Sequence, residues 1–278
     1  MGSARLWAIR AGAIFMVAMA LVVAPQRASA DPDALWRFLH LRSDALWQLV
    51  HNACVPAQAR IHNPAPCRYV SPQDGRPEGY AIIKDRIGSR QYLLVPTSRV
   101  TGIESPALLE PGSSGYWAAA WESTRYLETL LGDKVPRDGL GIAVNSALGR
   151  TQHQLHFHIQ CVRPDVRAKL IAAEKSIRQS WSTVALPPFD HVYHVRKLIG
   201  ADLNGKNVFQ IVADQGPDYA GNMAIQTVVV IGAVFRDGRE GFYILNNHVD
   251  LARRDQASGE ELLDRRCTLL DGTASASH

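Results

Sequence analysis

The stretch from Gln154 to Cys161 constrains the fold most, because polar and apolar residues alternate along it. A period of two is typical of a β-strand, whose successive side chains point to opposite faces of a sheet. The apolar positions are Leu155, Phe157, Ile159 and Cys161, and the polar positions are Gln154, His156, His158 and Gln160. The pattern predicts a strand with one buried face and one polar face, on which alternate side chains stand about 7 Å apart.

The residues before this strand favour a functional role for its histidines. The apolar segment Leu140–Val144 ends at Asn145, and the polar segment Gly149–Gln152 leads into the histidines. A strand, a polar turn and a second strand predict a hairpin-like platform with hydrogen-bond donors for a phosphate. Two other interpretations stay open at this point. The imidazoles are ordinary polar residues of a strand, or they bind zinc, for which no third ligand lies at short spacing.

The stretch His156–Val162 resembles the signature of the histidine-triad superfamily, in the version that ends in Gln and is found in nucleotidyl transferases. Asn145 and Gln152 stand thirteen and six residues before His158. In that superfamily an Asn or Gln and a Gln take these positions before the nucleophilic histidine. In the alternative register His156 is the central histidine, and this spacing is lost.

Further blocks of sequence resemble the bacterial CDP-diacylglycerol pyrophosphatases. In chain order they are Cys54 with Pro64–Cys67, Gln91–Thr97, Gly102–Pro106, Val144–Ser146, Gly149–Gln152 and Cys161–Val166. The region after about Ala185 carries no matching motif. The resemblance implies a histidine-triad-like α+β fold and an enzyme that hydrolyses the pyrophosphate bond of CDP-diacylglycerol to CMP and phosphatidate.

The same resemblance implies a role for each matching residue. His158 would attack the CMP phosphorus with one uncharged ring nitrogen, while the other nitrogen donates to a backbone carbonyl near His156. His156 would assist the leaving oxygen, and water would then hydrolyse the nucleotidyl-histidine. Contacts to the phosphates and the nucleoside are assigned to Asn145, Gln152, Gln160, Arg150, Thr151 and Lys84, with no metal and no cofactor. For Arg150 and Thr151, a role as turn residues is the alternative.

Two other functions are weighed against this one. A nucleotidyl transferase that passes CMP to another acceptor, or a pyrophosphatase of other nucleotide diphosphate esters, also fits Gln160. A non-enzymatic exported module that binds lipid leaves the spacing of Asn145, Gln152 and His158 unexplained.

The N-terminus has the features of an export signal. Arg5 and Arg10 precede an apolar run from Ala11 to Pro25, and Ala28–Ala30 offers a cleavage site of small residues. Because the run is shorter than the roughly 20 residues that span a bilayer, a signal peptide is predicted over residues 1–30. An uncleaved membrane anchor is the alternative. Both place the protein outside the cytoplasm, in the periplasm or at the periplasmic face of the inner membrane.

Composition adds little about partners. The formal net charge of +4 is small and the basic residues are scattered, so no nucleic-acid partner is predicted. The segment Pro32–Val55 has apolar residues at helical spacing, which predict one or two amphipathic helices that pack on the core. Contact of its Trp36 and Trp47 with a membrane surface is the alternative. The sequence leaves the oligomeric state open.

The cysteines agree with export. The chain has four of them, an even number that favours two disulfides over free thiols in an exported protein. Three pairings are open, and proximity along the chain favours Cys54 with Cys67 and therefore Cys161 with Cys267. The alternative for Cys161 is a small residue of the core.

The remaining patterns predict an α+β fold with an antiparallel sheet and flanking helices. Strands are predicted at Tyr80–Asp85 and Gln91–Pro96, a helix capped by Ser113 and Ser114 at Tyr116–Leu131, and a helix capped by Asp165 from Val166 to about Trp181.

Residues 31–186 are assigned to the catalytic region and 187–278 to a C-terminal α+β portion of the same domain. In this portion Gln226–Ile231 and Gly241–Leu245 predict a hairpin around Asp237 and Gly238. We expect it to form a second sheet packed on the first. Its histidines, His191, His194 and His248, lie in no motif and are assigned structural roles.

Overall fold

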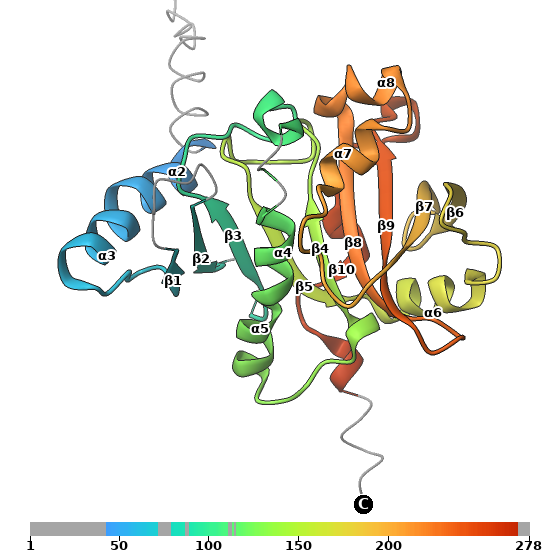
Figure 1. The fold of residues 1–278 in the computed structure, drawn as a ribbon, viewed down its shortest axis with the longest axis horizontal. Helices are drawn as coiled ribbons and strands as arrows, with labels where there is room; N and C mark the ends of the chain where they lie inside the picture. Colours follow the sequence, from blue (N-terminus) through green and yellow to red (C-terminus); the bar gives the residue numbers. More distant parts are fainter. Residues whose placement is uncertain (1–42, 72–78, 87–88, 111–112, 114, 272–278) are drawn as a thin grey trace, which may run out of the picture.

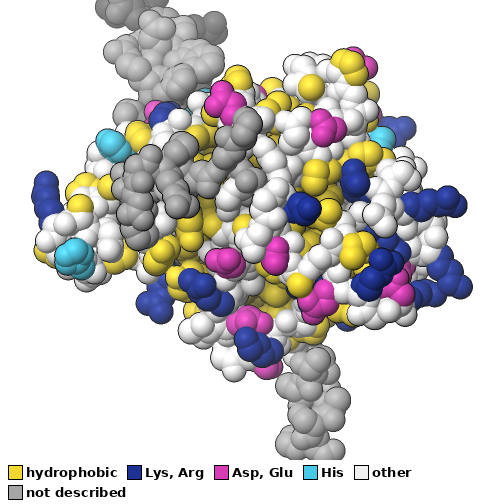
Figure 2. Space-filling view, viewed as in Figure 1, with side chains coloured by type: hydrophobic (Ala, Val, Ile, Leu, Met, Phe, Trp, Pro, Cys, Tyr) yellow, Lys and Arg dark blue, Asp and Glu magenta, His cyan; other side chains and the backbone are white. Residues whose placement is uncertain are grey.

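The computed structural model describes residues 43–271, apart from 72–78, 87–88, 111–112 and 114 (Figure 1). The predicted leader and the first part of the helical segment that follows it lie outside these residues. None of the helices in the described ranges combines the length and the apolar composition needed to cross a bilayer. On the face shown in Figure 2, acidic and basic side chains are interspersed.

One antiparallel sheet of ten strands organises the described residues. The strands are β1 (Tyr69–Val70), β2 (Tyr80–Lys84), β3 (Tyr92–Pro96), β4 (Leu140–Val144), β5 (Phe157–Val162), β6 (Ser182–Leu186), β7 (His191–Ile199), β8 (Gln226–Val234), β9 (Glu240–His248) and β10 (Leu263–Asp264). Their order is β1-β2-β3-β5-β4-β8-β9-β7-β6, and β10 pairs with β5. The structure confirms the predicted α+β class and places the histidine strand in the middle of the sheet.

The expected second sheet is wrong. β8 pairs with β4, with Val229 opposite Ala143, so the C-terminal strands extend the first sheet edge to edge. The predicted hairpin itself is confirmed, because β8 and β9 pair from Gln226 and His248 down to the turn at Gly238, whose φ is 81°. Nearly all residues of β8 and β9 are buried, which is why their apolar runs continue on both faces.

Helices cover both faces of the sheet (Figure 1). The α-helices are α2 (Ala45–Leu49), α3 (Val55–Ile61), α4 (Gly115–Glu122), α5 (Thr124–Leu131), α6 (Pro164–Ala173), α7 (Val208–Ala213) and α8 (Pro217–Ala220). A π-helical turn, η1 (Val50–Cys54), joins α2 to α3, and short 3-10 turns are η2 (Pro106–Leu109), η3 (Arg137–Gly139), η4 (Met223–Ile225), η5 (Leu251–Arg253), η6 (Gly259–Leu262) and η7 (Thr268–Leu270).

The largest core lies between the sheet and α4, α5 and α7. Trp117 of α4 is its centre, with its ring edge-on to Phe157 of β5 at 5.0 Å and tilted against Phe209 of α7 at 5.1 Å between centroids. On the opposite face, one smaller core joins Val166 of α6 to the strands β4, β8 and β9, and another joins the α2–α3 segment to β2 and β3. Burial of these apolar side chains is the main stabilising contribution to the fold.

Several predicted helix boundaries differ from the structure. The single helix predicted over Tyr116–Leu131 is broken at Ser123, whose hydroxyl donates to Ala119 O at 2.7 Å and competes with the helical pattern. Gly132 ends α5 with a φ of 70°, as predicted. Ser113 Oγ donates to Leu108 O at 2.6 Å instead of capping a helix, and Ser114 lies outside the described residues.

The helix predicted from Val166 to Trp181 begins two residues earlier, at Pro164, and ends at Ala173. Asp165 therefore lies in the first turn, where its carboxylate binds Arg163 at 2.7 Å. At the end of this helix, the side chain of Glu174 accepts a hydrogen bond from Arg236 N at 3.0 Å. This contact joins positions 62 residues apart, so the local pattern carries no sign of it.

Both disulfides favoured by the sequence are present, Cys54–Cys67 and Cys161–Cys267. The first fixes the loop that follows α3, and the second ties the C-terminal segment to β5. Disulfides of this kind are typical of proteins in an exported or oxidising environment.

Candidate active site

His158 lies at the centre of the sheet. It stands directly opposite Leu93 of β3 on one side and Ala143 of β4 on the other. Because cross-strand partners share a face, its imidazole lies on the face that also carries the two smaller cores. The face that the sequence predicts to be polar is also buried, because only 5% of His158 and 8% of His156 is exposed.

The cover over His158 comes from the C-terminal segment. Gly259 packs so closely on the sheet that a Cβ there would lie 2.5 Å from a Val229 methyl and 3.2 Å from Ala143 Cβ. Its N–H also donates to Thr227 Oγ1 at 3.0 Å. A residue without a side chain is therefore needed at this position, and it brings the next residue, Glu260, down onto β5.

Glu260 holds its carboxylate against His158. Its Oε1 lies 3.2 Å from His158 Nε2 and accepts a hydrogen bond from Asn145 Nδ2 at 3.0 Å. Its Oε2 accepts from Arg265 at 2.8 Å. The contact with His158 lacks hydrogen-bond alignment, and neither ring nitrogen of His158 has a hydrogen-bond partner among the described residues. Asn145 and His158 therefore meet at one bound carboxylate.

The charges at this contact are set by burial and by neighbours. Burial lowers the pKa of His158 to about 3, although the Glu260 carboxylate acts to raise it. Burial acts to raise the pKa of Glu260, but the charge and hydrogen bond of Arg265 and the hydrogen bond of Asn145 act to hold it below its usual value. At neutral pH the pair is a neutral imidazole beside an anion.

His156 has a different environment. Its Nδ1 lies 2.7 Å from the backbone oxygen of Gln154, and its ring stands edge-on to His158 with 4.8 Å between centroids. Burial lowers the pKa of His156, against the effect of that backbone hydrogen bond. The backbone contact expected to fix the tautomer of His158 is thus made by His156 instead.

Two buried carboxamides continue the polar row. Gln160 follows Ile159, which pairs with Tyr92, and Gln91 precedes Tyr92, so the two glutamines come next to each other across β3 and β5. Gln91 Nε2 donates to Asp85, but Gln91 Oε1 and both side-chain polar atoms of Gln160 have no hydrogen-bond partner among the described residues. Buried polar atoms without partners are rare in folded proteins. Here they lie beside the equally unpaired nitrogens of His158.

The other predicted binding residues contact partners other than His158. Gln152 Oε1 accepts from Leu46 N at 2.9 Å, in the first turn of α2. Arg150 forms a two-pronged ion pair with Glu104 at 2.5 and 2.6 Å, and Thr151 is exposed.

Lys84 lies on the opposite face of the sheet from His158. It pairs with Tyr92, whose side chain belongs to the core under α4 and α5. Its Nζ donates to Asp85 O at 2.9 Å.

The surroundings of His158 include three residues to which the sequence interpretation assigned no role in the site. They are Glu260, Arg265 and Gln91. Glu260 is 115 residues from Asn145, and no motif surrounds it.

The burial of His158 predicts a loss of stability in acid. The pKa of His158 is about 3 in the folded protein, against the ordinary histidine value of 6.5 that applies in the unfolded chain. Below pH 6.5 the unfolded chain therefore takes up a proton that the folded chain does not. This residue should lower the free energy of unfolding by roughly 2 kcal/mol between pH 6.5 and 4.5. Urea unfolding of wild type and His158→Asn across this range measures the difference in slope.

Gln160→Ala is the matched control, because it removes a buried polar neighbour on the same strand without removing a titrating group. It should shift the whole stability curve and leave the slope unchanged. Equal slopes for wild type and His158→Asn would contradict the assignment.

A comparison with known protein families finds a match over the part of the chain that carries this geometry. A family model described as CDP-diacylglycerol pyrophosphatase matches residues 41–271. The match includes β5 and the C-terminal segment with Glu260.

Proposed function

The chain belongs to the CDP-diacylglycerol pyrophosphatase family, and from this premise we propose that His158 is the nucleophile that cleaves the substrate through a nucleotidyl-histidine. The family is one of hydrolases that act on the pyrophosphate bond of CDP-diacylglycerol. The remaining question is which groups of this chain perform the chemistry.

The carboxylate of Glu260 carries the proposal, because it marks a built site for an anion. Asn145 and Arg265 donate to its two oxygens, and His158 Nε2 stands 3.2 Å from one of them. A phosphate that displaced this carboxylate would meet the same donors. For attack, its phosphorus would have to come within about 3 to 3.5 Å of Nε2.

The reaction then proceeds in two displacements. His158 Nε2 attacks the phosphorus of the CMP moiety, the bond from this phosphorus to the bridging oxygen breaks, and phosphatidate leaves with the electron pair. Water next attacks the same phosphorus, the bond to Nε2 breaks, and CMP is released. The imidazole is restored, and the proton of the water is left to solvent.

The electrostatics of the site suit an attack on a diphosphate. A pyrophosphate ester repels anionic nucleophiles, so an uncharged attacking group is favoured. Burial keeps the pKa of His158 at about 3, and the imidazole is therefore uncharged at neutral pH. The unpaired Nε2 of Gln160 is available to donate a hydrogen bond to a phosphate oxygen of the substrate.

One observation favours His156 as a second candidate for the nucleophile. Its Nδ1 contacts the Gln154 carbonyl, which would fix the proton on Nδ1 and leave Nε2 with its lone pair. This is the arrangement that the alternative register of the triad requires. The spacing of Asn145 from His158 and their meeting at Glu260 favour His158.

The proposal extends to the class of fold and the place of action. We assign the sheet around β5 to the histidine-triad type and the substrate to a membrane surface at the periplasmic side of the inner membrane. The site combines Asn145 and His158 from the region 31–186 with Glu260 and Arg265 from the region 187–278. The two parts are therefore treated as one catalytic domain.

Trapping of the covalent intermediate tests the mechanism. Wild-type protein mixed with CDP-diacylglycerol labelled in cytidine and quenched rapidly should carry acid-labile label on a peptide that contains β5. His158→Ala should carry none, and His156→Ala should carry less. Label that persists in His158→Ala and disappears in His156→Ala would move the nucleophile to His156.

Isotopic water identifies the acceptor and the phosphorus that is attacked. In water enriched in oxygen-18, hydrolysis through CMP-histidine places the heavy oxygen in CMP. Heavy oxygen in phosphatidate would contradict the proposal, since it requires attack on the other phosphorus. CDP-alcohols and ADP as alternative substrates show whether the diacylglycerol moiety is required.

A further inference from the structure

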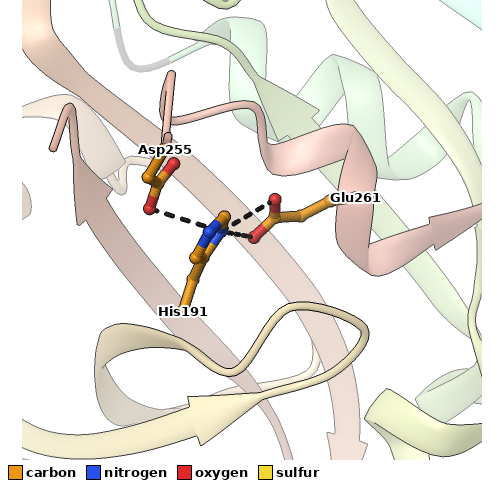
Figure 3. A group of neighbouring side chains, drawn as sticks. All are labelled: His191, Asp255 and Glu261. Atoms are coloured by element: carbon orange, nitrogen blue, oxygen red, sulfur yellow. Dashed lines mark hydrogen bonds and ion pairs between the residues drawn. The ribbon is translucent and has the colours of Figure 1, made fainter. Parts of the chain in front are cut away.

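A second cluster of polar side chains lies beside the proposed active site. His191, at the start of β7, faces Asp255 and Glu261 of the C-terminal segment (Figure 3). Glu260 and Glu261 are consecutive, but the first contacts His158 and the second contacts His191. The η6 turn thus supplies one carboxylate to each of two separate centres.

Three carboxylate oxygens converge on one imidazole nitrogen. His191 Nδ1 lies 2.9 and 3.1 Å from the two oxygens of Glu261 and 3.3 Å from Asp255 Oδ2. One N–H can point along only one of these directions, so it cannot form well-aligned hydrogen bonds to all three oxygens. A metal ion, which forms several coordination bonds, could bind the nitrogen and the carboxylate oxygens together.

The separations match the edges of a metal coordination shell. With metal–ligand bonds of about 2.0 to 2.2 Å, neighbouring ligands in tetrahedral or octahedral geometry stand about 2.9 to 3.5 Å apart. The ligand atoms of His191, Asp255 and Glu261 all lie within 4.8 Å of one another. An ion can therefore be placed among them with small side-chain adjustments.

The carboxylates are held in place by further hydrogen bonds. Tyr193 Oη donates to Glu261 Oε1 at 2.8 Å, and Asn247 Nδ2 donates to Asp255 Oδ2 at 2.6 Å. The backbone N–H of Ala257 donates to Asp255 Oδ1 at 2.7 Å. Outer hydrogen bonds of this kind orient the ligands of metal sites and leave their remaining lone pairs aimed at the ion.

The cluster opens into a cavity of about 840 Å³. His191 and both carboxylate residues line it, together with Arg253 and Arg254. Three protein ligands at the wall of a cavity leave a coordination position for water or for another ligand. Arg253 pairs with Asp250 at 3.5 Å, so Arg254 and the charge of a bound cation are what favour an anion at that position.

We propose that His191, Asp255 and Glu261 bind one divalent transition-metal ion whose open coordination position faces this cavity. One imidazole and two carboxylates form a ligand set for Zn²⁺ or Mn²⁺, because Ca²⁺ and Mg²⁺ favour oxygen ligands alone. The open position binds a phosphate group beside Arg253 and Arg254. The site is independent of the mechanism proposed for His158.

Calorimetric titration with Zn²⁺ tests the site directly. The full chain, without a histidine tag and freed of metal by a chelator, should bind one Zn²⁺ per chain. Glu261→Gln keeps the shape of the side chain and should weaken binding by at least about 100-fold, as should His191→Gln. No saturable binding by the wild type, or unchanged binding by both variants, would overturn the proposal.

Two matched variants locate the ion. His194→Gln removes another imidazole of β7 and should bind Zn²⁺ as the wild type does. His158→Asn should also bind normally, which keeps this test separate from the proposed catalytic mechanism. A loss of binding in His158→Asn with normal binding in His191→Gln would place the ion at the other centre and overturn the assignment.

Co²⁺ provides a spectroscopic signal that depends on metal binding at the site and not on folding alone. Co²⁺ bound in place of Zn²⁺ should give visible absorption bands, and inorganic phosphate should shift them by entering the open position. Asp255→Asn should lose the bands while its far-ultraviolet circular dichroism stays that of the wild type. Bands that are unaffected by phosphate would refute the open position.

Discussion

His158→Asn is expected to lower kcat for CDP-diacylglycerol hydrolysis by about 10⁴-fold or more, since it removes the proposed nucleophile and with it the proposed covalent route. Asn approximates the size of imidazole and keeps a polar group beside Glu260, so the fold should persist. KM should change little, because the donors to the phosphate, Asn145 and Arg265, are retained. Steady-state release of CMP at saturating substrate measures the effect.

Two comparisons make this result specific. His51→Asn, at an exposed position of η1, should leave kcat unchanged. His156→Asn should lower kcat by a smaller factor than His158→Asn, because it removes a group that orients or assists rather than the attacking atom. A larger loss in His156→Asn than in His158→Asn would instead support the alternative register.

Removal of the Cys161–Cys267 disulfide is expected to have the second largest effect. The bond closes a loop across a separation of 106 residues, and the chain-entropy model gives about 4 to 5 kcal/mol for such a loop. The whole stability of a domain is about 5 to 15 kcal/mol. Cys161→Ala combined with Cys267→Ala should therefore unfold at much lower urea concentration than the wild type under non-reducing conditions.

The other disulfide is a built-in control. Cys54–Cys67 spans a separation of 13 residues, for which the same model gives about 3 kcal/mol. The variant without Cys161–Cys267 should also lose activity while still folded, because that bond anchors the segment that carries Glu260 and Arg265. Equal loss of stability in both double variants would argue against the entropic explanation.

Much of the local structure could be predicted from the sequence. The apolar segment Leu140–Val144 and the hairpin at Gly238 correspond to strands found in the sheet. The strand predicted over Gln154–Cys161 begins only at Phe157, so His156 lies just before it. Alternation and turn residues act within a few positions of the chain, so their effect is visible without knowledge of the fold. Helix boundaries were less accurate, because Ser123 and Glu174 make contacts that a helical pattern does not reveal.

The candidate site was predicted only in part. Asn145 and His158 meet as their spacing suggested, but the meeting runs through Glu260. Arg150 carries a charge that suits a phosphate, yet two of its guanidinium nitrogens donate to the carboxylate of Glu104. The residue type shows which groups a side chain is able to bind. Which group it does bind depends on the partners that distant segments of the chain bring to it.

The sequence by itself determined that β5 is a strand, which residues share its face with His158, and that an even set of cysteines forms disulfides. Tertiary structure decided that both faces of this strand are buried and that the C-terminal segment covers His158 with Glu260. The reason is physical. Periodicity records only whether a side chain leaves the chain on one side or the other, whereas the groups that it meets depend on strand order and on contacts more than 100 residues apart.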